Sequence, residues 1–254
     1  MLLAIDVGNT NITLGVFRDQ ELLALWRLVT NPASTADEYG AETRNLFQLA
    51  EIDFQKIEAI VVSSVVPPLN NAIKQMAEVY FQRTPVFVDH TTDTGLRIVY
   101  QPASAVGMDR VVDAVAAVAR HGQPCIVVDF GTATTFNAVN SKGEYVGGLI
   151  APGLKISAEA LFSRTAKLPR VDITRPAKVI GSSTVEAIQS GLYYGYASLV
   201  DGVLRRMIDE MGEKPHIVAT GGLAPLIAPE SEFIENVDDT LTLEGLRLIY
   251  ERNA

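Results

Sequence analysis

The sequence predicts an α/β protein made of two copies of one β-rich unit, with a ligand cleft between the copies. One observation is that a strand ending in Asp-x-Gly, a short turn and a second strand open the chain as LLAIDVGNTNITLGVF and return as CIVVDFGTATTFNAV. A second is that aligning Asp6 with Asp129 also aligns Gly8 with a later glycine, at 131. A third is that a polar turn and a third strand follow each pair, which is typical of an internal repeat.

The first copy shows the alternation of apolar residues typical of strands, followed by stretches with helical spacing. Leu3, Ile5 and Val7 alternate with other residues, and Gly8-Asn9 is typical of a tight turn. The expected elements are two strands within 2–17, a third strand at 21–30, a helix at 37–51, a strand at 57–66, a helix at 70–83 and a strand at 85–89.

The second copy begins after a helix expected at 109–121, which is rich in Ala and Val and is closed by Gly122. The alignment of the two turns also places Phe17 on Asn140. After its three strands, the expected elements are helices at 154–162 and 183–211, a strand at 216–220, a helix at 223–228, a strand at 232–237 and a last helix at 242–252. The expected domains are an N-terminal lobe, 1–116, and a C-terminal lobe, 117–254.

Composition favours a folded protein and disfavours several partners. The chain has 254 residues, 48% of them hydrophobic, and its one cysteine, Cys125, is expected to be a buried, inert thiol. A net charge of −9 disfavours nucleic acid, whose backbone is bound by clustered Lys and Arg. No apolar run approaches the ~20 residues that a membrane helix needs, and the start, MLLAID, lacks the basic region of a signal peptide. We therefore expect a cytoplasmic protein with no membrane partner.

The two Asp-x-Gly turns are candidate phosphate sites. Turns rich in Gly, Asn and Thr expose backbone N–H groups that can surround phosphate oxygens. Nearby hydroxyl donors are Thr10, Thr132 and Thr134. Asp6 and Asp129 bring negative charge, which suits an anion site only where a cation such as Mg²⁺ or an ordered water lies between. One such turn is compatible with an ordinary hairpin, but two at matching points of a repeat favour a nucleotide site, with ATGGLA at 219–224 as a third contact.

The segment Gly107-Met108-Asp109-Arg110 is the candidate acceptor site. The carboxylate of Asp109 can take the proton of a substrate hydroxyl during phosphoryl transfer, and Arg110 can hold an anionic substrate group. The structural alternative is that Asp109 only caps or begins the helix that follows. The three histidines lie far apart without metal-ligand spacing, so we expect no metal role for them.

With these motifs described, the chain closely resembles type III pantothenate kinase over essentially its whole length. The blocks that carry the resemblance are DVGNTN at 6–11, DEYG at 37–40, VVSSVVPPL at 61–69, TGLRI at 94–98, GMDR at 107–110, DFGTATT at 129–135, GG-x-I-x-PG at 147–153, SRTAKLPR at 163–170, STVEAIQSG at 183–191 and ATGGLA at 219–224. The resemblance implies two duplicated ribonuclease H-like lobes of the actin-like ATPase superfamily, with mixed five-stranded sheets and an interlobe cleft. It implies ATP-dependent phosphorylation of pantothenate to 4′-phosphopantothenate, the first step of coenzyme A biosynthesis.

The resemblance also implies roles for individual residues. Asp109 is the expected proton acceptor, Asp6 is expected to bind magnesium with ATP, and Asp129 a monovalent cation, K⁺ or NH₄⁺. The residues expected to contact ATP are Asp6, Val7, Gly8, Asn9, Thr10, Asn11, Ile12, Thr13 and Thr132. The residues expected to contact pantothenate are Tyr100, Gly107, Met108, Asp109, Arg110 and Thr184. A homodimer is expected, with the pantothenate pocket near its interface, so that Thr184 serves the neighbouring protomer.

Two positions depart from the family pattern. Met108 stands where Ala is more usual, which would narrow the substrate pocket, and Thr13 stands where some relatives have Lys, which removes a phosphate-neutralising charge. Two other functions are open to a protein of this fold: a regulatory protein that senses a nucleotide, and a hydrolase that cleaves ATP or polyphosphate. Release of ADP that depends on pantothenate distinguishes the kinase from both.

Overall fold

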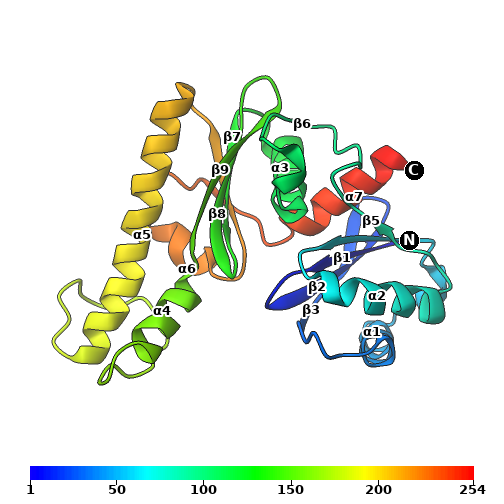
Figure 1. Cartoon of the computed structure of the whole chain (residues 1–254), viewed down its shortest axis with the longest axis horizontal. Coiled ribbons are helices and arrows are strands. Elements are labelled where there is room, and N and C mark those ends of the chain that lie inside the picture. Colours follow the sequence, from blue (N-terminus) through cyan, green and yellow to red (C-terminus); the bar gives the residue numbers. More distant parts are fainter. The chain divides into compact units, whose positions relative to one another are not determined.

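The computed structural model describes residues 1–254, which divide into two compact units. Unit 1 comprises residues 1–96, 101–116 and 242–254, and unit 2 comprises residues 97–100 and 117–241. The division after residue 116 falls within one continuous helix, α3 (Met108–His121) (Figure 1). The last helix was expected in the C-terminal lobe but belongs to unit 1, because its apolar face is buried against the strands of that unit.

Unit 1 contains a five-stranded sheet in the order β3-β2-β1-β4-β5. Its strands are β1 (Leu2–Val7), β2 (Asn11–Arg18), β3 (Glu21–Val29), β4 (Ala59–Ser64) and β5 (Val86–Phe87). The first three strands are antiparallel neighbours, and β4 and β5 continue the sheet in the same direction as β1. The sheet is therefore mixed, as expected.

Different helices cover the two faces of the unit 1 sheet. The helical segments are α1 (Ala36–Leu49), η1 (Phe54–Lys56), α2 (Pro67–Met76), η2 (Ala77–Phe81), η3 (Ala103–Ala105), the first part of α3, and α7 (Leu241–Asn253). Leu3 and Ile5 pack with α1 and α2, which lie together beside the strands in Figure 1. Leu2 and Ala4 point to the other face and pack with α7 and with Val112 of α3. Alternation along β1 thus builds a helix layer on each face.

Unit 2 contains a six-stranded sheet in the order β11-β10-β7-β8-β9-β6. Its strands are β6 (Arg97–Ile98), β7 (Cys125–Phe130), β8 (Ala133–Val139), β9 (Glu144–Pro152), β10 (His216–Thr220) and β11 (Asn236–Val237). Five strands were expected, and the sixth is β6, which lies parallel to β9. A strand of two residues carries no periodicity, so the sequence pattern could not reveal it. The strand expected at 232–237 is likewise reduced to its last two residues.

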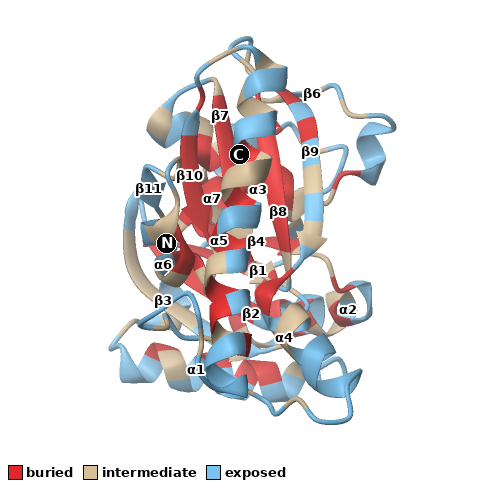
Figure 2. Ribbon diagram, turned by 90° about the vertical axis from the view of Figure 1, so that its left-hand side faces the viewer, coloured by how far each residue is buried: buried red, intermediate tan, exposed pale blue.

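One face of the unit 2 sheet is covered by a long helix. The helical segments are α4 (Leu154–Ser163), α5 (Thr184–Met211), α6 (Ala224–Ile227) and η4 (Ala228–Glu230). Ile126 and Val128 of β7 and Phe136 of β8 pack with Tyr193 and Val200 of α5, and Figure 1 shows α5 running beside these strands. Figure 2 shows β7, β8 and β10 buried along most of their length, whereas β9 alternates between buried and exposed residues.

Capping residues begin the two longest expected helices. The hydroxyl of Thr35 accepts a 3.2 Å hydrogen bond from the N–H of Glu38, whose carboxylate accepts one of 2.7 Å from the N–H of Thr35. The hydroxyl of Ser183 accepts from the N–H of Glu186 at 3.2 Å in the same way. Helix α5, which begins after Ser183, ends at Gly212, and this glycine takes the left-handed conformation (φ +63°) that commonly ends helices.

Strand pairing shows the internal repeat and an asymmetry within it. The order β9-β8-β7-β10-β11 repeats the order β3-β2-β1-β4-β5. Asp6 lies opposite Thr13, seven residues later, whereas Asp129 lies opposite Thr135, six residues later. The second turn is therefore one residue shorter than the first.

The shorter turn makes the expected match of Phe17 with Asn140 wrong by one residue. Leu2 pairs with Phe17, and Cys125, which corresponds to Leu2, pairs with Val139. The register of the next strand pair shifts immediately before this point in both units, which places a bulge at equivalent positions. A gap-free alignment cannot detect a deletion inside a turn, whereas backbone hydrogen bonding across the hairpin reports it directly.

Candidate active site

The β1–β2 turn of unit 1 carries most of the residues expected to contact ATP. The N–H of Gly8 donates to the carbonyl oxygen of Asn11 at 3.0 Å. The N–H of Thr30 donates to the carbonyl oxygen of Thr10 at 3.0 Å, and its hydroxyl donates to that of Gly8 at 2.6 Å. These bonds hold the turn, while residues Asn9 to Asn11 are exposed. An ordered turn with exposed backbone is suited to binding phosphate oxygens.

The remaining residues of this segment differ in how accessible they are. Val7 and Ile12 pair at the base of the turn and are buried in the core, so they can meet a ligand only through their backbone. Thr13 is half-buried on β2. The segment expected as one ATP contact therefore contains an exposed tip and a buried base.

Asp6 lies between two hydroxyl-bearing residues in the sheet. Its partner on β2 is Thr13 and its partner on β4 is Ser63. Residues two apart on a strand point to the same face, so Asp6 shares a face with Ala4, and Ser63 with Val61. Ala4 and Val61 pack on the face that carries α3 and α7. The half-buried carboxylate and both hydroxyl residues therefore point to one face of the sheet.

Asp129 has the same kind of neighbours in unit 2. Its partners across the sheet are Thr135 on β8 and Thr220 on β10. A Cβ at Gly221 would overlap with Oδ1 of Asp129, and one at Gly131 would lie 3.1 Å from Oδ2. Because φ of Gly221 is +90°, this position also disfavours any other residue. The carboxylate thus lies close to the backbone of two glycines, at positions where a side chain would collide with it.

The second turn offers fewer hydroxyl donors than expected. Thr132 is exposed at its tip, and Gly153 lies so close that a Cβ there would overlap with the carbonyl oxygen of Thr132. Thr134 is buried, and its hydroxyl lies 2.6 Å from that of Tyr196, which donates to the carbonyl oxygen of Pro152 at 2.7 Å. The expectation that Thr134 donates to phosphate is therefore wrong, because its hydroxyl is used within the core.

Asp109 lies in the first turn of α3, which begins at Met108, so it is not the cap of that helix. Burial raises the pKa of its carboxyl above the ordinary range, and the N–H and the charge of Arg110 partly oppose this rise. Oδ1 of Asp109 is buried without a hydrogen-bond partner, and a Cβ at Gly107 would overlap with it. A buried carboxylate with a raised pKa and an unused oxygen is typical of a proton acceptor.

The other expected substrate contacts are spread over both units. Arg110 is buried and lies beside Asp109 in unit 1. Met108 packs against the apolar cluster that contains Val112 and α7, so its extra bulk fills that cluster. Tyr100, in unit 2, has its ring against Gly147, where a Cβ would lie 3.3 Å from Cδ2. Thr184 is exposed as the first residue of α5.

Sequence reasoning missed three residues beside the two carboxylates: Ser63, Thr135 and Thr220. For Ser63 and Thr220 the available signal was a hydroxyl residue near the carboxyl end of an otherwise apolar strand, in AIVVSS and HIVAT. Which strands lie next to Asp6 and Asp129, and in which register, is visible only in the folded sheet.

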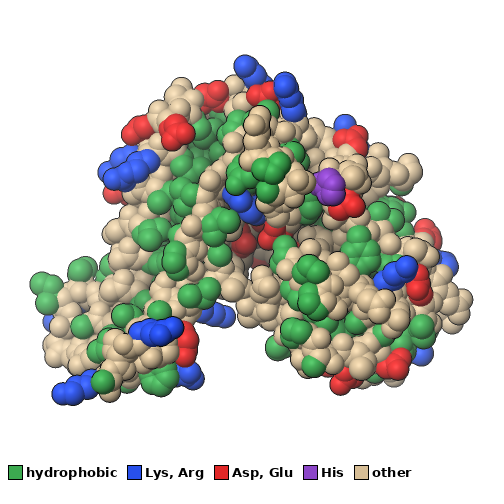
Figure 3. All heavy atoms as spheres, in the orientation of Figure 1, with side chains coloured by type: hydrophobic (Ala, Val, Ile, Leu, Met, Phe, Trp, Pro, Cys, Tyr) green, Lys and Arg blue, Asp and Glu red, His purple; other side chains and the backbone are tan.

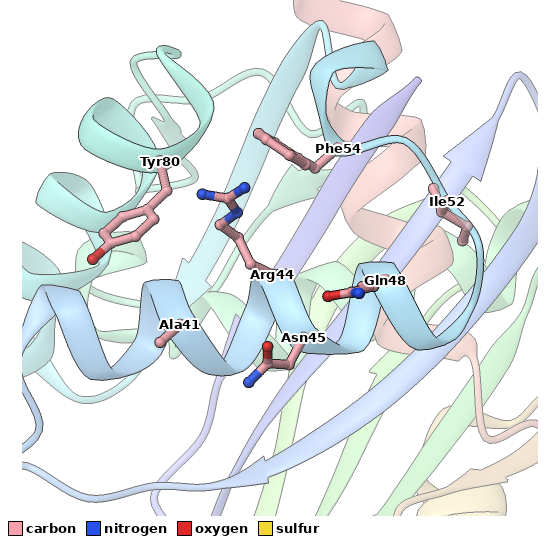
Figure 4. Close-up of a pocket in the computed structure, with 7 residues that line it drawn as sticks. All are labelled: Ala41, Arg44, Asn45, Gln48, Ile52, Phe54 and Tyr80. Carbon is pink, nitrogen blue, oxygen red and sulfur yellow. The ribbon is translucent and has the colours of Figure 1, made fainter.

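A surface groove of about 510 Å³ on unit 1 contains none of the expected site residues. Its lining residues are Ala41, Arg44, Asn45, Gln48, Ile52, Phe54 and Tyr80. Figure 4 shows the Arg44 side chain projecting from α1 between Phe54 and Tyr80. The guanidinium carbon of Arg44 lies 4.5 Å from the centre of the Phe54 ring, and the Tyr80 hydroxyl donates to Asp37 at 2.9 Å. Arg44 and Tyr80 thus already have partners within unit 1, and no residue of the groove belongs to the expected site.

The donor set fits a divalent metal carried by a nucleotide. No group of three or more His, Cys, Asp or Glu side chains is arranged to hold a metal ion. Mg²⁺ is commonly held by one or two carboxylates together with substrate phosphates, and the half-buried carboxylate of Asp6 beside the phosphate-type turn meets that requirement.

None of the helices has the length and apolar character needed to cross a bilayer.

Comparison with known proteins points to one family. A family model described as type III pantothenate kinase matches residues 2–206. A type III pantothenate kinase of Koribacter versatilis is 54% identical over 263 residues, covering 100% of this chain and 96% of its own. One of Halalkalibacterium halodurans is 51% identical over 254 residues and covers 100% of both chains.

Solved structures show the same fold at low sequence identity. A conserved putative Baf family transcriptional activator from Campylobacter jejuni has a TM-score of 0.62 and 19% identity, covering 99% of this chain and 98% of its own. Component A of (R)-2-hydroxyglutaryl-CoA dehydratase from Acidaminococcus fermentans has a TM-score of 0.55 and 14% identity, with coverages of 98% and 96%. An ROK hexokinase from Thermus thermophilus has a TM-score of 0.50 and 14% identity, with coverages of 100% and 99%. The fold is therefore that of the actin- and hexokinase-like ATPases.

Proposed function

Because the chain belongs to the type III pantothenate kinase family, we propose that it transfers the γ-phosphoryl group of ATP to the primary hydroxyl of pantothenate. The product is 4′-phosphopantothenate, and the reaction is the first step of coenzyme A biosynthesis. The observation that carries this assignment is the buried carboxylate of Asp109, with its raised pKa and unused oxygen, in the segment that resembles the pantothenate-binding segment of the family. Since the reaction consumes ATP, we place it in the cytoplasm.

Asp109 accepts the proton of the pantothenate hydroxyl as the new O–P bond forms and the bond between the γ-phosphorus and ADP breaks. Burial makes its carboxylate a stronger base than a solvated one, and Oδ1 has no competing hydrogen bond. Arg110, the next residue, holds the carboxylate of pantothenate by a charge-assisted hydrogen bond. Gly107 keeps the space beside Oδ1 open.

The β1–β2 turn, from Asp6 to Thr13, binds the phosphates of ATP. Its exposed tip offers backbone N–H groups, and the hydrogen bonds from Thr30 hold it in place before the nucleotide arrives. Magnesium, when bound at Asp6, would neutralise the charge that develops on the phosphate oxygens. Positioning and electrostatic stabilisation supply most of the acceleration in phosphoryl transfer, so a preformed turn contributes directly to the rate.

Asp129 holds a monovalent cation, K⁺ or NH₄⁺, and Thr132 contacts ATP. The carboxylate of Asp129 lies beside the backbone of Gly131 and Gly221, and the absence of a Cβ at these two positions leaves space for it. Exposure of Thr132 at the tip of the second turn supports its contact with the nucleotide. Thr134, whose hydroxyl is already used, has no part in this site.

The enzyme works as a homodimer that uses the exposed apolar side chains of unit 2. Ile156 and Phe162 of α4, Ile180, and Val185 of α5 are between 38% and 86% exposed. Figure 3 shows apolar side chains at the surface over the part of unit 2 that carries α4. Large apolar side chains exposed on one part of a surface favour association. Thr184, next to Val185, would then contact the pantothenate bound by the partner, as Tyr100 does within its own protomer.

Light scattering behind a sizing column should give twice the chain mass of 27.5 kDa.

The test is a coupled assay of ADP release with and without pantothenate, run first with K⁺ and then with Na⁺. A kinase should release ADP only when pantothenate is present. Its rate should be higher with K⁺ than with Na⁺. Cleavage of ATP or polyphosphate that is indifferent to pantothenate indicates a hydrolase. Nucleotide binding with no turnover indicates a sensor.

A further inference from the structure

We propose that Ser63 is a positioning residue of the phosphoryl-transfer site, whose hydroxyl donates a hydrogen bond to the Asp6 carboxylate in the metal–nucleotide complex. The proposal rests on the proposed kinase function and adds a residue that acts through Asp6. It assigns the second hydroxyl neighbour of that carboxylate a task in the reaction cycle.

The hydroxyl of Ser63 has no partner in the folded chain. The residue is 0% exposed, and its Oγ makes no hydrogen bond. Most buried polar atoms in native proteins are hydrogen-bonded, and a buried hydroxyl without a partner destabilises the folded state. Stability of the folded chain therefore does not explain why a serine occupies position 63.

The sheet places Ser63 beside Asp6. The two residues are direct partners in the parallel pairing of β1 with β4, and neighbouring strands lie about 4.8 Å apart. Two positions earlier, Ala4 and Val61 pack in one cluster, which shows that the two strands are in phase on that face. Neighbouring side chains on one face of a sheet are close enough to interact, so the Ser63 hydroxyl is placed to donate to the Asp6 carboxylate.

The next residue, Ser64, shows the contrast. Its hydroxyl donates to Asn70 at 2.6 Å and lies 3.3 Å from the N–H of Val66, so it holds the start of α2. Ser64 points to the opposite face of β4 from Ser63. One of the two serines thus has a structural task within the chain, and the other has none.

The repeat provides a second instance of the same neighbourhood. Thr220 on β10 is the direct partner of Asp129 on β7, as Ser63 on β4 is of Asp6 on β1. Thr220 is buried as well. Carboxylates that bind metals are commonly held by hydrogen bonds from such neighbours, and loss of one typically costs 10–100-fold in metal affinity or activity.

The test compares Ser63→Ala with Thr43→Val. Thr43, on α1, also has a buried hydroxyl without a partner, but α1 covers the opposite face of the sheet from Asp6. Three quantities are measured for each: the melting temperature without ligands, the Mg²⁺ concentration that gives half of the stabilisation by ADP, and kcat with pantothenate.

We expect Ser63→Ala to melt at the same or a higher temperature without ligands, because its hydroxyl bonds to nothing there. The Mg²⁺ concentration for half-stabilisation should rise about 10–100-fold, and kcat should fall by a similar factor. Thr43→Val should change neither quantity. Ser63→Thr, which restores a hydroxyl and matches the residue type of unit 2, should recover most of the Mg²⁺ dependence.

An unchanged Mg²⁺ dependence in Ser63→Ala overturns the proposal, whether or not the variant is less stable. An equal change in Thr43→Val overturns it too, because the effect would then follow from any buried hydroxyl. If the wild-type chain releases no ADP with pantothenate, the proposed function fails, while the ADP titration still decides the role of Ser63.

Discussion

The hydroxyl of Thr242 donates a hydrogen bond of 2.6 Å to the carboxylate of Asp113, 129 residues earlier in the chain. Asp113 is buried and lies one helical turn after Asp109 on α3. Three residues after Thr242, Gly245 approaches the backbone so closely that a Cβ would overlap with the carbonyl oxygen of Val112. The last helix therefore rests directly on the helix that carries the proposed proton acceptor.

Replacing Gly245 with Ala should destabilise unit 1. The added Cβ meets backbone atoms of Val112, which cannot move aside as a flexible side chain can, and overpacking of this kind costs about 1–3 kcal/mol. Urea unfolding measures the loss. The matched control is Gly202→Ala on α5, where a Cβ meets only the end of the Arg206 side chain at 3.5 Å. That change should be neutral or stabilise by about 0.5–1 kcal/mol, as expected for Gly to Ala in a helix.

Replacing Thr242 with Val should also lower stability, because it removes a hydrogen bond to a buried carboxylate. The expected loss is about 1.5–3 kcal/mol, the usual contribution of a hydrogen bond to a charged group. Thr242→Ser keeps the donor and should retain most of the stability. Equal losses in both variants would indicate that the methyl group, and not the hydroxyl, holds α7 in place.

Asp109→Asn should abolish turnover while leaving nucleotide binding intact. An amide cannot accept the hydroxyl proton, and general base catalysis typically contributes about 10²–10⁴-fold. The measurement is kcat with pantothenate, beside the stabilisation by ADP with Mg²⁺, which should match the wild type. A variant that keeps full kcat removes Asp109 from the mechanism.

The same variant should be more stable than the wild type at neutral pH. Burial raises the pKa of Asp109, so the folded chain binds its proton more tightly than the unfolded chain does. Stability falls as the pH rises from the ordinary aspartate pKa of about 3.9 to the raised value, and it stays lower above that window. Asp109→Asn escapes this loss, so its advantage in melting temperature should shrink as the pH is lowered through the window. If the wild type is more stable than Asp109→Asn at neutral pH, burial is not the main influence on the pKa of Asp109.

Gly221→Ala should remove the dependence on a monovalent cation. A Cβ there overlaps with Oδ1 of Asp129, and φ of +90° adds backbone strain. Gly222→Ala is the matched control, because nothing lies within 4 Å of its Cβ. The measurement is kcat as a function of K⁺ concentration. Unaltered K⁺ activation in Gly221→Ala, or equal loss in Gly222→Ala, argues against a cation at Asp129.

Local patterns explain what was predictable. The alternation in LLAIDV and the helical spacing after Met108 are properties of neighbouring residues, so strands and helices were expected close to where they lie. Of the strands that contain only two residues, β5 and β11 lie within the longer strands expected at 85–89 and 232–237, whereas β6 was not expected. The bounds of β5 and β11, and the existence of β6, depend on pairing with neighbouring strands. Such pairing contacts leave no period in the sequence.

The sequence by itself determined the two hairpins with their carboxylates and the family to which the chain belongs, because each depends on residues that are close together in the chain. It also predicts the acceptor segment around Asp109. Only the tertiary structure decided that the second turn is one residue shorter, that α7 rests on α3, and that Ser63 lies beside Asp6. Parallel strand register and helix docking are set by contacts between distant residues, such as Thr242 with Asp113, whose free energy no local pattern expresses.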